Sequence, residues 1–121
     1  MQKIKVMLAS RPKLLSEVIR NIIEHQTDME LVGEVLDPLQ LIYAFRETPA
    51  DVVIITPLNA NGEPKICHLL LNEYPKLKII TQSEKGEIAY LYQSGVEKKV
   101  IDKPSGQAIL IAIRQALGNS Q

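Results

Sequence analysis

Residues 51–57 read Asp-Val-Val-Ile-Ile-Thr-Pro, and they constrain the fold more than any other stretch of the chain. Four consecutive β-branched apolar residues predict a strand buried on both faces, because a half-exposed strand would alternate polar with apolar residues. Burial on both faces implies helices above and below a mostly parallel sheet. In such sheets the chemistry lies just past the carboxyl ends of the strands, which is where Thr56 falls.

Strand and helix signals alternate along the whole chain. Strands are predicted at residues 3–9, 30–35, 52–55, 77–81 and 100–101. An amphipathic helix is predicted after each strand, from apolar residues at three- and four-residue spacing. The fourth helix is predicted from Ile88, Ala89, Leu91 and Tyr92, with Gly95 as its C-terminal stop. Ser105 is predicted to cap the last helix.

Five strand–helix units with right-handed crossovers predict an α/β fold. The expected architecture is a flavodoxin-like (βα)5 doubly wound parallel sheet with strand order 2-1-3-4-5. The carboxyl ends of strands one, three, four and five then converge on one crevice. The residues predicted to line it are Ser10, Arg11, Thr56, Thr81 and Lys103.

The bulk properties of the chain narrow its class. Its 121 residues suffice for one domain, expected over residues 1–121, with residues 116–121 as a possible start of a linker. Lys plus Arg and Asp plus Glu each number 14, which argues against broad binding to nucleic acid or an anionic membrane. The single cysteine, Cys67, cannot close an intrachain disulfide and suits a reducing compartment. We therefore expect a soluble, cytoplasmic protein.

Several segments resemble the receiver domain of bacterial response regulators, the CheY-like superfamily, closest to those that precede a helix-turn-helix output domain. Residues 4–8 and 29–34 are similar to its first two strands, and residues 49–55 to the strand that leads into its phosphorylated aspartate. Lys103-Pro104 matches the family's lysine and the proline after it. Thr81 falls at its hydroxyl switch position, with Ser83 as the rival. The resemblance implies a role in two-component signal transduction and phosphorelay.

The departures from the family pattern fall on its acidic residues. Where the resemblance implies two acids that bind magnesium, this chain has Ser10 and Arg11. The phosphoacceptor aspartate matches Thr56. The aromatic switch residue matches Val100 or Lys99, neither of which is aromatic. The chain thus resembles a degenerate receiver, a pseudo-receiver.

These losses have a direct chemical consequence. Phosphoryl transfer to an aspartate needs a carboxylate nucleophile and a metal that neutralises the moving charge. A cation about 4 Å from Arg11 would cost on the order of 4 kcal/mol at an effective dielectric near 20. We therefore predict no magnesium site, no cofactor and no aspartyl phosphate. Nor does the chain contain a glycine-rich phosphate loop or a nucleophile elbow, so we predict that it is not an enzyme.

Three functions remain open after these exclusions. The first is a phosphorylation-independent receiver domain that acts through protein–protein contact. The second is a sensor that binds a small anion between Arg11 and Lys103. The third is the regulatory domain of a helix-turn-helix transcription regulator, if an output domain follows Gln121; nothing in this segment reads DNA directly. Structural alternatives also stay open, with Thr56 and Lys103 as turn residues and Arg11 facing solvent.

The resemblance also implies a contact surface on the fourth helix, fifth strand and fifth helix, for a protein partner or a second copy. The residues expected there are Tyr92, Lys99 and Val100. Tyr92 is the candidate anchor, because tyrosine is enriched at interfaces; the alternative is that it packs against its own neighbours. Lys98 and Lys99 are expected on an edge strand, where lysines discourage unwanted pairing.

Overall fold

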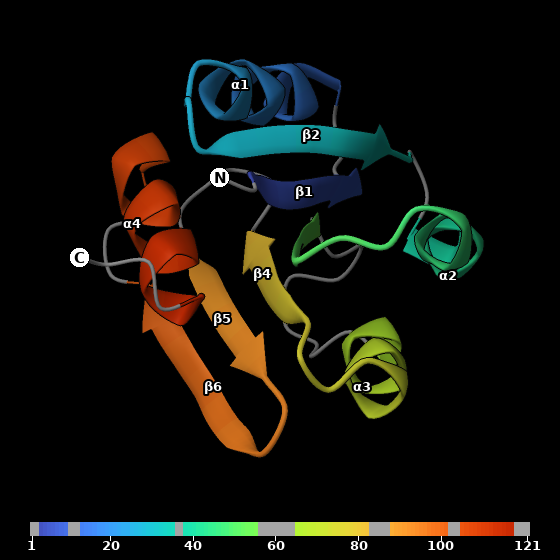
Figure 1. The fold of residues 1–121 in the computed structure, drawn as a ribbon. Helices are drawn as coiled ribbons and strands as arrows, with labels where there is room; N and C mark the ends of the chain where they lie inside the picture. The colour runs from blue at the N-terminus through green and yellow to red at the C-terminus, as the bar shows by residue number, and fades with distance from the viewer. Residues whose placement is uncertain are drawn as a thin grey trace.

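The computed structural model describes residues 3–9, 13–35, 38–55, 65–82, 88–101 and 105–117. Within these ranges the strands are β1 (Ile4–Ala9), β2 (Met29–Glu34), β3 (Val52–Ile55), β4 (Lys78–Gln82), β5 (Ala89–Gln93) and β6 (Val96–Ile101). The helices are α1 (Lys13–Glu24), α2 (Pro38–Glu47), α3 (Lys65–Glu73) and α4 (Gly106–Ala116). The strands form one sheet in the order β2-β1-β3-β4-β5-β6 (Figure 1).

The sheet confirms the predicted fold class. β1 pairs in parallel with β2 and β3, and β3 pairs in parallel with β4. The first four strands have the predicted order 2-1-3-4. The predicted fifth strand belongs to β6, and one additional strand, β5, lies between it and β4. The sheet is not parallel throughout, because β5 runs antiparallel to both β4 and β6.

The predicted fourth helix is wrong: its residues form strand β5. A two-residue turn joins β5 to β6, and the two strands make a hairpin that lies at one end of the sheet (Figure 1). Leu91 packs on the α4 side of the sheet, while Tyr90 and Tyr92 pack on the α3 side, which is the period-two alternation of a strand. Gly95 has φ 76° in the hairpin turn, a backbone conformation that also ends helices, so its presence in the sequence fits both structures.

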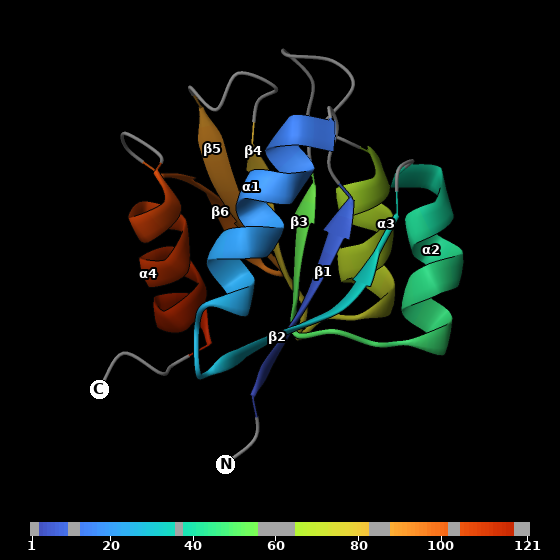
Figure 2. The same cartoon turned by 90° about the horizontal axis from the view of Figure 1, so that it is seen from above.

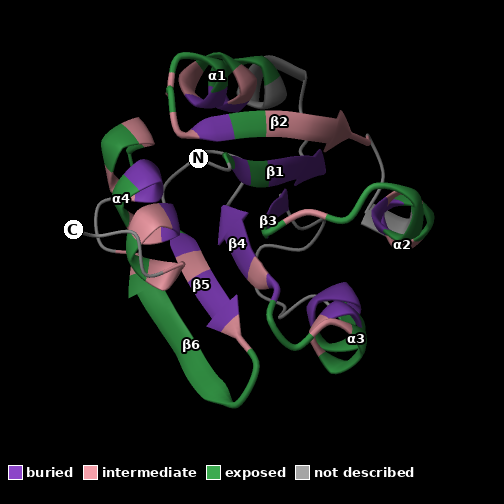
Figure 3. Ribbon diagram, in the orientation of Figure 1, coloured by how far each residue is buried: buried purple, intermediate pink, exposed green. Residues whose placement is uncertain are grey.

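The central strand is buried on both faces, as predicted. Val52 and Ile54 belong to the core cluster that α1 and α4 cover, and Val53 and Ile55 belong to the cluster that α2 and α3 cover. All four side chains are 0% exposed. Figure 2 shows the helices on the two sides of the sheet, and Figure 3 shows the buried residues of β1, β3 and β4 between them.

The helix boundaries follow local signals in the sequence. α2 begins at Pro38, whose missing N–H is not needed in the first turn. α3 ends at Glu73, before Pro75. Ser105 caps α4, and its hydroxyl oxygen accepts a hydrogen bond of 3.2 Å from the Ala108 N–H. Cys67 on α3 is fully buried in the core, as predicted.

A bidentate ion pair ties α4 to the connection between α1 and β2. The Arg114 guanidinium donates to both carboxylate oxygens of Asp28, at 2.8 and 2.9 Å, and to the Gln26 side-chain oxygen at 2.8 Å. These hydrogen bonds from Arg114 hold the pKa of the Asp28 carboxyl below its ordinary value. The pair links the last turn of α4 to the residues that precede β2.

Candidate functional site

The carboxyl ends of the parallel strands meet at one edge of the sheet, as the sequence predicted. One line of paired residues crosses the sheet there: Ala9, Ile55, Thr81, Tyr90 and Val100. Ala9 and Ile55 directly precede Ser10 and Thr56 in the chain. The strands that lead into those two predicted site residues are therefore neighbours in register.

Only one residue of the predicted crevice can be placed. Thr81 is the next-to-last residue of β4 and is 3% exposed. Ser10, Arg11, Thr56 and Lys103 lie outside the described residues, and so does the rival switch residue Ser83. Anion binding and the expected lack of a magnesium site therefore stay predictions.

Strand β5, which the sequence did not predict, increases the distance between β4 and the strand that leads to Lys103. The sequence placed the strand leading to Lys103 directly beside the fourth strand. In the structure β5 lies between them, so Ile101 pairs with Ala89, and Ala89 pairs with Gln82. Because neighbouring strands lie about 4.8 Å apart, the end of β6 is about 10 Å from β4 instead of about 5 Å.

Gln82 is a polar residue at this edge that the sequence analysis missed. It is 7% exposed and ends β4 directly after Thr81, with its side chain on the opposite face of the sheet. Among the described residues, its side-chain oxygen Oε1 is a buried acceptor without a hydrogen-bond partner. A sequence signal did exist, because a second polar residue follows Thr81 where a buried strand would favour an apolar one.

Gln82→Met is expected to raise the free energy of unfolding by about 1 kcal/mol, because a buried acceptor without a donor costs about 1–3 kcal/mol and methionine has a similar shape. Urea unfolding followed by circular dichroism measures the change. Gln93→Met is the matched control at a half-buried site on β5, where the change should stay within about 0.5 kcal/mol. Equal effects at the two positions would contradict the assignment of Gln82 as an unsatisfied group.

The described residues hold no group of three or more His, Cys, Asp or Glu side chains that could bind a metal ion. His25 lies just beyond the end of α1, where its ring Nδ1 is 2.7 Å from the Asn21 carbonyl oxygen. In the same part of the chain, none of the helices has both the length and the apolar character needed to cross a bilayer.

Two of the three residues expected on the contact surface are exposed, and a contact made there stays a prediction. Lys99 and Val100 lie on β6, and Val100 is 61% exposed. Tyr92 is 5% exposed and belongs to the core cluster on the α3 side, so its prediction as a surface anchor is wrong. The cause is the change from helix to strand, which turns Tyr92 toward α3.

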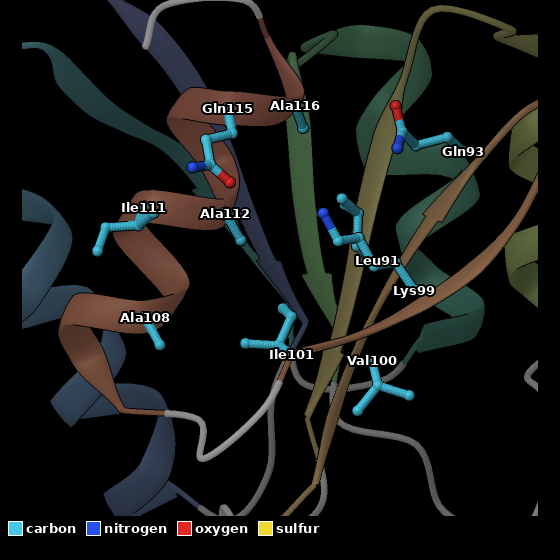
Figure 4. Close-up of a pocket in the computed structure, with 10 residues that line it drawn as sticks. All are labelled: Leu91, Gln93, Lys99, Val100, Ile101, Ala108, Ile111, Ala112, Gln115 and Ala116. Atoms are coloured by element: carbon cyan, nitrogen blue, oxygen red, sulfur yellow. The ribbon is translucent and has the colours of Figure 1, made fainter.

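Two hollows flank the β5–β6 hairpin. The first lies between α4 and the hairpin and has a volume of about 280 Å³ (Figure 4). The second lies between α3 and the hairpin, is lined by both polar and apolar residues, and has a volume of about 820 Å³. The first is bounded by residues of the predicted fifth strand and fifth helix, so it lies on the expected contact surface.

No family model and no curated protein sequence matches this chain. Solved structures do match it. The response regulator domain of Thermotoga maritima CheB superposes with a TM-score of 0.70 at 20% identity, over 97% of this chain and 98% of that domain. The isolated REC domain of RcsB from Salmonella enterica serovar Typhimurium, in the presence of the phosphomimetic BeF3−, gives 0.59 at 23% identity over 68% of this chain.

The matched part spans 62% of that isolated RcsB domain and 44% of a longer RcsB structure, which was described for its conformational dynamism in DNA interaction. The longer structure superposes with a TM-score of 0.58 at 24% identity. The likeness establishes the fold: this chain has the architecture of response-regulator receiver domains.

Proposed function

We propose that this chain is a receiver-type regulatory module that acts through protein contact and does not depend on phosphorylation of an aspartate. The observation that carries the proposal is the end of β3. The strand has the burial and neighbours of a receiver's central strand, and the residue that follows its last position, Ile55, is Thr56. A threonine hydroxyl is a far weaker nucleophile than a carboxylate.

The charge at the neighbouring position supports the same proposal. Ser10 and Arg11 follow β1, the strand beside β3, where a receiver would need acidic metal ligands. A neutral hydroxyl and a permanent cation do not form a magnesium site. The proposed module therefore signals by what binds its surface, without a metal cofactor and without enzymatic turnover.

The test is a titration with beryllofluoride and magnesium, followed by amide NMR spectra. The Thr81 amide at the end of β4 is the reporter. We expect no saturable shift of its resonance, because no carboxylate is available to form the beryllofluoride adduct. The isolated RcsB REC domain is the positive control. A one-to-one titration that moves the Thr81 resonance would overturn the proposal.

A second candidate, supported by the likeness to RcsB, is the regulatory part of a longer DNA-binding regulator. The match covers under half of the longer RcsB structure. In that case the protein contact proposed here would be made between this domain and its own output domain or between two copies. The reading frame beyond Gln121 decides it: a following helix-turn-helix domain supports this candidate, and a stop codon there removes it.

A further inference from the structure

The outer edge of β6 is open. β6 is the last strand in the sheet order, and five of its six residues are exposed. Within the described residues, no other strand pairs with its outer side (Figure 1). Every second residue of an edge strand directs its N–H and C=O groups outward, so β6 offers a template for one more strand.

A groove lined mainly by apolar residues, with Gln93, Lys99 and Gln115 also in its lining, runs beside this open edge. We call it the α4 groove; it is bounded by Leu91, Lys99, Ile101, Ala108, Ile111 and Ala112. Ala108 and Ala112 are one turn apart on α4 and project toward the sheet, and their small side chains leave the hollow open (Figure 4). Ile111 is 50% exposed at its rim. A strand added to β6 would direct every second side chain to this face of the sheet.

The charge of β6 defines what it can accept. Lys99 pairs with Leu91 and lies on the groove side, and Lys98 lies on the other face with its Nζ 4.6 Å from the centre of the Tyr90 ring. Glu97 is the one acid among the six residues of β6. Adjacent lysines oppose pairing with a second lysine-bearing edge, but they attract carboxylates. β6 thus carries two lysines and one acid, an excess of positive charge that favours an acidic partner.

We propose that β6 binds an extended acidic segment of a partner protein as an additional strand of the sheet. The segment alternates apolar and acidic residues: the apolar side chains enter the α4 groove, and the carboxylates on the opposite face lie near Lys98. Six residues of β6 span about 20 Å, so about six residues of the partner can pair. This inference rests on the proposed function, since it names the class of partner that the contact surface takes.

The experiment measures fluorescence anisotropy of a labelled eight-residue peptide that alternates valine and aspartate. We expect saturable binding to the full chain, and no binding of the valine–lysine counterpart. A third peptide is a copy of the valine–aspartate peptide with N-methyl groups on alternate amides. Because alternate N–H groups point to the same edge of a strand, this copy cannot donate hydrogen bonds along one of its two edges. It should lose binding when the methylated amides face β6. Equal affinity for all three peptides overturns the proposal.

Variants of the protein locate the site. K98E/K99E is expected to weaken binding of the valine–aspartate peptide on the order of tenfold and to create binding of the valine–lysine peptide. K65E/K76E makes the same change in net charge at exposed positions on and after α3, and should leave binding unchanged. Ala112→Leu fills the α4 groove and should weaken binding with an unchanged circular dichroism spectrum. Equal losses in both charge-reversed variants contradict the assignment to β6.

The oligomeric state is measured in the same samples by sedimentation velocity. A dimer that dissociates on adding the peptide would show that a second copy occupies the edge, which also overturns the proposal. The two proposals fail separately. Binding of beryllofluoride would remove the phosphorylation-independent function and leave peptide binding intact, whereas absence of peptide binding removes only the inference about the partner.

Discussion

Ile54→Ala should lower the free energy of unfolding by about 2–5 kcal/mol, because the substitution removes three carbon atoms from a closely packed site. Ile54 lies in the middle of β3, is 0% exposed and belongs to the core cluster that α1 and α4 cover. Its β1 and β4 neighbours, Leu8 and Ile80, are also 0% exposed, so little around it can relax into the space. A domain of this size has a total stability of about 5–15 kcal/mol.

Ile111→Ala is the matched control for this prediction. The chemical change is the same, but Ile111 is 50% exposed on α4, where alanine also has the better helix propensity. The change there should stay within about 0.5 kcal/mol. Urea unfolding of the two variants and the parent chain gives both values. Similar losses at the two positions would contradict the placement of β3 at the centre of the sheet.

Helix α1, strand β3 and the boundaries of the other helices were predicted correctly because the residue pattern of each fits only one kind of secondary structure. Four β-branched residues in β3 cannot form a half-exposed surface, and prolines and a serine mark where α2, α3 and α4 begin or end. The periodicity of three and four residues in α1 has no strand alternative. In these segments the local residue pattern and the burial in the fold favour the same secondary structure, so the pattern alone was enough to predict it.

Residues 88–101 were harder because their local pattern fits two structures. Ile88, Ala89, Leu91 and Tyr92 satisfy helical spacing, but in the fold Leu91 and Tyr92 lie on opposite faces of the sheet. Two tyrosines in five residues favour a strand, since aromatic side chains pack well on a pleated surface. What decides between the two structures is pairing with β4, a contact between distant residues that periodicity alone does not contain.

The candidate site was predictable only in outline. Convergence of the strand ends follows from parallel pairing, and the register of Ala9, Ile55 and Thr81 bears it out. The distance of the strand leading to Lys103 was not predictable, because it depends on the inserted strand β5. That Gln82 Oε1 has no hydrogen-bond partner among the described residues was not predictable either, since this depends on which donors the surrounding fold supplies.

The hairpin also changes one part of the contact surface that the family resemblance implied, because a strand replaces the expected helix at residues 88–95. With a helix at residues 88–95, partners would meet a helix face anchored by Tyr92. With a strand there, Tyr92 turns inward, and the open edge of β6 and the α4 groove become the accessible features. Main-chain hydrogen bonds of a strand edge suit an extended partner, whereas a helix face would have suited a folded one.

Tyr92→Ala distinguishes a core position of Tyr92 from a surface position. Only a core side chain should contribute strongly to the free energy of unfolding. Tyr92 is 5% exposed, packs in the core cluster that α2 and α3 cover, and lies with its ring centroid 6.4 Å from that of Tyr90. Truncation of a large buried aromatic side chain costs about 3–5 kcal/mol, so the free energy of unfolding should fall by about that amount. Urea unfolding measures it.

Tyr43→Ala provides the comparison, because Tyr43 is 71% exposed on α2 and its truncation should change stability by no more than about 0.5 kcal/mol. Peptide binding by Tyr92→Ala is measured without urea and at low temperature, where the variant remains folded. Its affinity for the valine–aspartate peptide should match that of the parent chain, because the Tyr92 ring faces α3 and not the α4 groove. A variant with parental stability but weakened peptide binding would make Tyr92 an anchor after all, and would require residues 88–95 to present it outward.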